Sequence, residues 1–249
     1  MTEIALPVAG PAPEGPARWP DADEIRALCL DAGNTLLFLD FEAIATTVRE
    51  TGFPIDASSI ERAEYEARRL VDRAYMEGGF DDRSMWHQYF TWMLDAASVS
   101  ASLVESLVER LREQHVEQNL WRRPGAGVAP ALERVRASGR RIAVVSNSDG
   151  TCREALQRAG LLELIDAVID SSEVGVEKPN SGIFHAALSE LGVSAGEALH
   201  AGDLEAIDVR GARRAGLVPV LIDPYPAPGE LDYRVVRSVS ELPAALGLR

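Results

Sequence analysis

The pattern of apolar and polar positions divides the chain into two kinds of segment. From about residue 124 onward, short apolar runs alternate with stretches in which apolar residues recur every three or four positions. The first pattern is typical of buried strands and the second of amphipathic helices. With one more apolar run near the N-terminus, the predicted strands are 26–31, 141–146, 166–170, 197–202 and 218–222. The predicted helices are 127–138, 151–159, 181–191, 205–215 and 240–246.

This alternation predicts the class of fold. Strands that alternate with helices form a parallel sheet with helices on both faces, because each crossover between parallel strands is right-handed. The expected architecture is therefore α/β, a doubly wound, Rossmann-like parallel sheet. In such sheets ligands bind at the carboxyl ends of the strands.

The stretch from 41 to 122 has only the helical pattern and is predicted to contain no strand. Its expected helices are 41–51, 58–77, 84–97 and 100–120, with N-caps at Ser58, Ser84 and Ser100. We therefore predict an all-helical cap domain, residues 41–122, inserted into a catalytic core made of 23–40 and 123–249. Residues 1–22 contain five prolines and are predicted to be a flexible tail.

Composition and charge limit the classes of partner. The chain has 39 acidic and 25 basic residues, a net charge of −14, which disfavours binding to nucleic acid. Its apolar runs are far shorter than the ~20 residues of a membrane-spanning helix. The two cysteines, Cys29 and Cys152, have neither the spacing of a zinc site nor that of a disulfide framework. We expect a soluble, cytoplasmic protein, whose oligomeric state the sequence does not indicate.

One basic residue differs from all the others. Of the 25 basic residues 24 are arginine, and Lys178 is the single lysine. An arginine replaces a lysine readily where the cation only faces solvent, but not where a compact ammonium acts as a point charge in a tight pocket. Either the lysine persists by chance or it has such a role.

Polar residues follow the predicted strands as one chemically coherent set. Asp31 ends the first strand, Ser146 and Asn147 end the second, and Asp203 ends the fourth, with Asp208 shortly after it. Carboxylates from separate strands indicate an oxygen-ligand site for a cation such as Mg²⁺. Hydroxyl and N–H donors beside a lysine indicate a phosphate site. The combination is typical of phosphoryl transfer.

In order and spacing, these residues resemble the four motifs of the haloacid dehalogenase (HAD) superfamily. Its DxDxT motif corresponds to Asp31-Ala32-Gly33-Asn34-Thr35, and its second motif, a strand ending in Ser or Thr, to IAVVSNS with Ser146. Its lysine motif corresponds to Lys178, and its GDxxxxD motif to Gly202-Asp203 through Asp208. The helical insertion is similar to the type C1 cap of that family, and the expected hinges lie at 36–41 and 123–125.

The resemblance implies a mechanism for a Mg²⁺-dependent phosphatase acting on a small phosphorylated substrate. Asp31 would attack phosphorus and form an aspartyl-phosphate, which water then hydrolyses. Mg²⁺ would be bound by Asp31, by the main-chain carbonyl of Gly33 and by Asp203, while Asp208 would hold metal-bound water or orient Lys178.

The remaining motif residues would contact the transferring group or support the loop. Ser146 and the main-chain amide of Asn147 would donate to the phosphoryl oxygens, and Lys178 would neutralise charge on the phosphate and on Asp31. Thr35 would brace the nucleophile loop or serve only as a turn residue.

The chain departs from the family pattern at Gly33. Phosphatases of the family have an aspartate at this position, which protonates the leaving group and then activates water. Loss of a positioned general acid typically costs 10²- to 10⁴-fold in rate. We therefore expect an activated substrate, a substitute acid or weak activity. The candidate substitutes are Asp149, His87 and Asp82, and at each of them a solvated or packed polar residue is the stronger expectation.

Three other readings of the family resemblance can be compared with this one. A phosphonatase would need a cap lysine, and the cap has none. A metal-independent dehalogenase also lacks the acid at position 33, but replaces the GD pair that this chain retains. A catalytically weakened protein that binds a phospho-ligand or a partner would have no need of the full set of Asp31, Lys178, Asp203 and Asp208.

Two features of the cap leave their roles open. Arg83, in the polar loop 78–83, either contacts an anionic substrate tail or belongs to an exposed turn. The aromatic run of Trp86, Tyr89, Phe90 and Trp92 either lines a substrate pocket or packs between helices. His115, His185 and His200 have no metal-ligand spacing and are expected to be structural.

Overall fold

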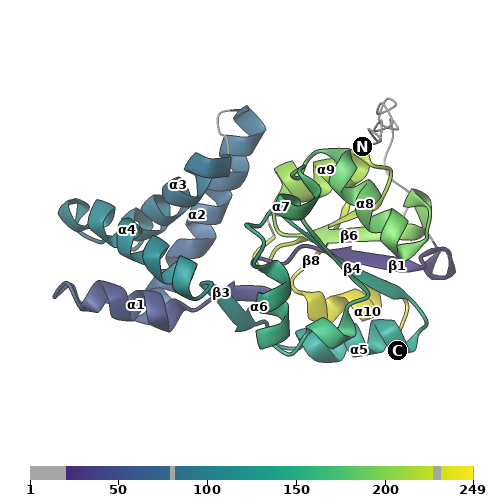
Figure 1. Ribbon diagram of the computed structural model, residues 1–249, viewed down its shortest axis with the longest axis horizontal. Helices are drawn as coiled ribbons and strands as arrows, with labels where there is room; N and C mark the ends of the chain where they lie inside the picture. Colours follow the sequence, from purple (N-terminus) through teal and green to yellow (C-terminus); the bar gives the residue numbers. More distant parts are fainter. Residues whose placement is uncertain (1–20, 79–81, 227–230, 249) are drawn as a thin grey trace. The chain divides into compact units, whose positions relative to one another are not determined.

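Six parallel strands form the sheet in one of the two units into which the chain divides (Figure 1). The computed structural model describes residues 21–78, 82–226 and 231–248. Unit 1 is Met1–Phe38 with Pro124–Arg249, and unit 2 is Leu39–Arg123. Almost all of the predicted tail, residues 1–22, lies outside the described residues.

The sheet of unit 1 has the strand order β5-β4-β1-β6-β7-β8. These strands are β1 Ala27–Leu30, β4 Arg141–Ser146, β5 Ala167–Asp170, β6 Ala198–Gly202, β7 Val218–Ile222 and β8 Arg234–Val236. All neighbouring pairs are parallel, with β4 and β6 on the two sides of β1. The order reverses at β1, so its carboxyl end is where such folds bind ligands.

Helices cover both faces of the sheet, which confirms the predicted doubly wound α/β fold. In Figure 1, α7, α8 and α9 lie over one face and α5, α6 and α10 over the other. Their bounds are α5 Val128–Ala137, α6 Cys152–Arg158, α7 Ser171–Val174, α8 Ser181–Leu191, α9 Arg210–Arg214 and α10 Leu242–Ala245. Every residue of β1 is buried, as expected for a central strand covered on both faces.

Short elements are where the sequence prediction was incomplete or wrong. The strands β8, β2 Leu37–Leu39 and β3 Trp121–Pro124 were not predicted. The predicted helix 205–215 is a π-helical segment, Glu205–Val209, followed by α9. Single 3₁₀ turns lie at Ala22–Glu24, Leu162–Leu164, Ala195–Glu197 and Val239–Glu241.

The described residues of unit 2 form four helices, α1 Phe41–Arg49, α2 Ala57–Glu77, α3 Asp82–Ala96 and α4 Ala101–Glu117. Helix α2 packs against α1 and α3, and α4 packs against α1 and α3. The N-cap of α2 is Asp56, whose carboxylate accepts from the Ser59 amide, so the predicted cap at Ser58 was wrong by two residues. Ser100 stands at the N-cap of α4, but its side chain makes no capping hydrogen bond.

The chain passes between the units within a two-stranded sheet of β2 and β3. The Asp40 amide donates to the Leu120 carbonyl at 2.9 Å, and the Asp40 carboxylate accepts from Arg122 Nε at 2.9 Å. The two ends of the helical insertion are thus held side by side. Among the described residues, no helix is both long and apolar enough to cross a membrane.

Candidate active site

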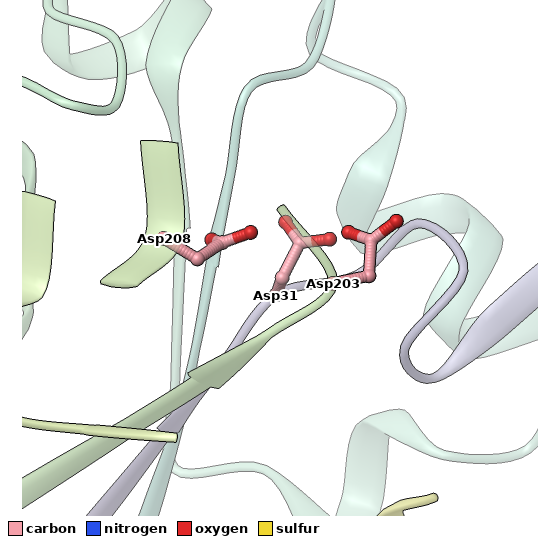
Figure 2. Close-up of side chains that lie close together, drawn as sticks. All are labelled: Asp31, Asp203 and Asp208. Atoms are coloured by element: carbon pink, nitrogen blue, oxygen red, sulfur yellow. The ribbon is translucent and has the colours of Figure 1, made fainter. Parts of the chain in front are cut away.

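Three carboxylates meet at the carboxyl end of the sheet (Figure 2). Asp31 directly follows β1, Asp203 directly follows β6, and Asp208 lies in the π-helical segment after it. One oxygen of each lies within 4.8 Å of those of the other two. Parallel strands that end at one edge therefore bring together residues separated by more than 170 positions.

Lys178 joins two of these carboxylates. Its ammonium donates hydrogen bonds to Oδ1 of Asp31 and to Oδ1 of Asp208, the second at 2.7 Å. The side chains of Lys178 and Asp208 are 1% and 0% exposed, whereas that of Asp31 is 11% exposed. Of these three side chains, that of Asp31 is the most exposed.

Asn147 fixes the backbone of Lys178. Its Nδ2 donates to the Lys178 carbonyl at 3.0 Å, and its Oδ1 accepts from the Lys178 amide at 2.7 Å. Because Asn147 follows β4, these two bonds tie the lysine segment to the edge of the sheet that carries Asp31. The sequence indicated a role for the main-chain amide of Asn147, and the structure adds a positioning role for its side chain.

Asp208 accepts hydrogen bonds at both carboxylate oxygens. Oδ1 accepts from Lys178 and lies 2.9 Å from His200 Nε2, while Oδ2 accepts from the Leu204 amide at 3.1 Å. The Asp208 carboxylate is close enough to join a metal site, yet its oxygens already have partners. This arrangement favours a role in orienting Lys178.

Burial and charge set the pKa values of these groups in opposite directions. Burial raises the pKa of Asp31 to about 6, against the lowering effect of Lys178. Burial also acts to raise the pKa of Asp208, but Lys178 and His200 outweigh it and hold this pKa well below its ordinary value. Burial acts to lower the pKa of Lys178, and the two carboxylates outweigh it, so this pKa is raised. Near neutral pH, Lys178 is therefore a fixed cation and Asp208 a fixed anion.

The loop after β1 shapes the space beside Asp31. The main-chain amides of Leu36 and Leu37 both donate hydrogen bonds to the Ala32 carbonyl and close this loop. Asn34 has φ 51°, a left-handed conformation that asparagine tolerates, and its Nδ2 lies 3.4 Å from Oδ2 of Asp203. Gly33 does not have a positive φ, so its backbone does not require glycine. Thr35 is buried, and its hydroxyl has no hydrogen-bond partner in the described structure.

The remaining predicted site residues lie in different places. Ser146 is the buried last residue of β4, level in register with Asp170 of β5. It therefore reaches the same sheet edge as Asp31. Arg83 belongs to α3, but its side chain lies outside the described structure.

The residues considered as substitutes for a general acid at position 33 also lie in different places. Asp149 is exposed and accepts from the Thr151 hydroxyl at 2.7 Å. His87, in unit 2, is half exposed, with Nε2 3.3 Å from Glu105. The side chain of Asp82 lies outside the described structure. No contact described for these residues gives any of them a role at Asp31.

The structure also places His200 and the aromatic run of the insertion. His200, expected to be structural, is fully buried, and its Nε2 lies 2.9 Å from Oδ1 of Asp208. The signal for it was a histidine two positions before Gly202 in an otherwise apolar strand. The aromatic run in the insertion packs internally, with Trp86 and Phe90 rings 4.2 Å apart and Phe90 fully buried. Packing is therefore the role that the structure shows for these two rings.

Comparison with known proteins identifies the class of protein that this site belongs to. The family model described as haloacid dehalogenase-like hydrolase matches residues 25–216. That range contains every motif residue of the site, and the chain belongs to this family of hydrolases.

Individual relatives support this assignment. Haloacid dehalogenase-like hydrolase domain-containing protein 3 of Bos taurus is 29% identical over 229 residues, covering 88% of each chain. Glyceraldehyde 3-phosphate phosphatase of Methanopyrus kandleri is 38% identical over 109 residues, 43% of this chain and 47% of that protein. The structure of a HAD-hydrolase from Bacillus subtilis bound to magnesium superposes with a TM-score of 0.65 at 20% identity, covering 90% of this chain and 99% of that one. Solved structures of dehalogenases share the fold as well.

Proposed function

We propose that the protein is a Mg²⁺-dependent phosphatase that hydrolyses a small-molecule phosphate ester or anhydride through an aspartyl-phosphate on Asp31. One observation carries the proposal. The Asp31 carboxylate is held beside a buried lysine that has Asp208 as a second carboxylate partner, and its side chain is more exposed than those of Lys178 and Asp208. Such a site can offer a nucleophile and a fixed positive charge to the same phosphoryl group.

The donor set fits Mg²⁺. This ion prefers oxygen ligands and is usually bound by one or two carboxylates together with water and phosphate oxygens. Asp31 and Asp203, with the main-chain carbonyl of Gly33, would bind it, and Asp208 would remain with Lys178. When bound, the ion would neutralise charge on the phosphoryl oxygens.

The residues of the chain have separate parts in the reaction. An oxygen of Asp31 forms a bond to phosphorus while the bond to the leaving oxygen breaks. Lys178 neutralises charge on the phosphoryl group, and the Ser146 hydroxyl and the Asn147 amide donate hydrogen bonds to its oxygens. Water then attacks the phosphorus of the aspartyl-phosphate, releasing inorganic phosphate and the Asp31 carboxylate.

Gly33 restricts the substrates that react well. Without a carboxylic acid at this position to protonate it, the leaving oxygen departs as an anion, so the substrate itself must stabilise the negative charge. Aryl and acyl phosphates do so, whereas alkyl phosphates such as sugar phosphates do not. We therefore propose a preference for activated phosphates. The relatives named as phosphatases support phosphoryl chemistry in general.

The test is a phosphate-release panel with and without Mg²⁺, comparing aryl and acyl phosphates with sugar phosphates and nucleotides. We expect turnover that requires Mg²⁺ and is lost in Asp31→Asn, but is kept in Asp23→Asn, a matched change at an exposed position. If the protein binds Mg²⁺ but releases phosphate from none of these substrates, the result would favour a protein that binds a phospho-ligand or a partner. Chelator-resistant halide release from haloacids would instead show a dehalogenase.

A further inference from the structure

A buried histidine lies behind the site and does not face the substrate. His200 belongs to β6, where Ala198, Leu199 and Ala201 are apolar and, like His200, fully buried. Its Nε2 lies 2.9 Å from Oδ1 of Asp208, and its ring packs edge-on against Phe184, with centroids 4.9 Å apart. An apolar residue here would avoid the cost of burying a polar ring.

The partners of Asp208 determine which nitrogen of His200 carries its proton. An ionised carboxylate can only accept hydrogen bonds, and Oδ1 of Asp208 already accepts from Lys178. A hydrogen bond to His200 therefore requires the proton on Nε2. The other ring nitrogen, Nδ1, is buried and has no partner in the described part of the chain. A proton on Nδ1 would be a buried, unsatisfied donor, so the neutral Nε2–H tautomer fits both sides of the ring.

His200 also limits how the Asp208 carboxylate can turn. The Leu204 amide holds Oδ2, and Lys178 and His200 hold Oδ1. The ammonium group of Lys178 is at the end of a flexible four-carbon side chain, so it can follow the Asp208 carboxylate if that carboxylate moves. Without His200, no partner on the sheet itself would fix the Oδ1 side of Asp208.

We propose that His200 is a positioning residue, whose Nε2–H holds the Asp208 carboxylate toward Lys178 and thereby keeps the ammonium against Asp31. The chain of contacts runs from His200 through Asp208 and Lys178 to Asp31. In its catalytic consequence this inference rests on the proposed function, since it assumes that Asp31 is the nucleophile. The hydrogen bond itself does not depend on that assumption.

The kinetic test compares three variants of the full-length protein. His200→Leu removes the donor at similar size, and His200→Gln keeps an N–H at about the distance of Nε2. Phe184→Leu is the matched control, because it loosens the same packing without touching the hydrogen bonds. We expect His200→Leu to lower kcat by about 10- to 100-fold, the usual effect of losing a residue that orients a site group. KM should change much less, and His200→Gln should recover most of kcat.

A spectroscopic test needs no turnover. The chain has four histidines, and the imidazole ¹⁵N signals of His200 can be assigned by their loss in His200→Gln. We expect the Nε2–H tautomer, with signals that shift in Asp208→Asn. A proton on Nδ1, or His200 signals that do not shift in Asp208→Asn, would overturn the proposal.

The kinetic outcomes separate this inference from the proposed function. If wild-type protein releases phosphate and His200→Leu matches Phe184→Leu in kcat, or His200→Gln is as impaired as His200→Leu, the positioning role is refuted and the phosphatase stands. If wild-type protein turns over nothing, the proposed function fails, and the imidazole spectra decide whether the hydrogen bond to Asp208 exists.

Discussion

The Asp208 carboxylate fills the space that a side chain at Gly202 would need. A Cβ atom built at Gly202 would overlap the carboxylate, although Gly202 has no positive φ. Position 202 therefore requires glycine because the carboxylate of Asp208, six positions later in the same motif, lies so close to it.

Gly202→Ala is expected to damage both folding and activity. The added methyl group must displace Asp208, and overpacking of this kind typically costs about 1–3 kcal/mol of stability. Because Asp208 holds Lys178, kcat should fall at least ~10-fold. Thermal unfolding and steady-state kinetics measure the two effects. Gly196→Ala is the control, since a Cβ there has no neighbour within 4 Å, and equal behaviour of the two variants would contradict the prediction.

Lys178→Met should destabilise the fold, because it leaves two buried carboxylates without their cation. Breaking a buried ion pair by removing one partner typically costs about 3–5 kcal/mol. Asp31→Asn should cost much less, since Lys178 keeps Asp208 as its partner. Denaturant unfolding of the two variants measures the difference. A Lys178→Met protein as stable as Asp31→Asn would show that the carboxylates do not need the lysine.

Gly33→Asp tests whether an absent acid limits the reaction. The backbone at Gly33 does not require glycine by its φ, so an aspartate is acceptable there in conformation. A positioned acid contributes about 10²- to 10⁴-fold, and the gain should be seen with alkyl phosphates far more than with aryl phosphates. The measurement is kcat/KM for matched alkyl and aryl substrates. Gly33→Asn has nearly the same shape without the proton, and it should give no gain.

Glu197 gives a pH-dependent contribution to stability at the opposite end of β6 from the site. Hydrogen bonds from the Ser194 hydroxyl and amide, at 2.6 and 2.9 Å, lower the pKa of Glu197 to about 2. A folded-state pKa below the unfolded value stabilises the fold above about pH 4.5, and this stability is lost as the pH falls toward 2. Glu197→Gln should therefore lower Tm at pH 7. The difference from wild type should shrink steadily below pH 4.5, and a gap independent of pH would disprove the charge-based explanation.

The sequence was most informative where one physical rule links position to geometry. Parallel strands end at one edge, so Asp31, Ser146 and Asp203 could be expected together before any coordinates were known. Lys178 was found by composition, since it is the single lysine. The alternation of short apolar runs with amphipathic helical stretches was sufficient to predict the fold class.

Other features depend on tertiary contacts that no local pattern contains. The strands β2 and β8 have three residues each, which is too short for a periodic signal, and β3 has two arginines and a proline in place of an apolar run. The π-helical segment 205–209 has a helical pattern in its sequence, and its extra width is seen only in the hydrogen bonds. The tertiary partner of His200 is likewise absent from the local pattern, because Asp208 meets it only after the chain turns back.

The β2–β3 pairing has a consequence for how this protein can be rebuilt. Because the Asp40 amide bonds to the Leu120 carbonyl, the entry and exit of the helical insertion are neighbours in space. Closing a gap between ends that already touch needs only a short turn, and the entropy of loop closure grows slowly with length. We therefore expect that residues 41–119 can be shortened or replaced as one insertion without altering the two ends to which it is joined.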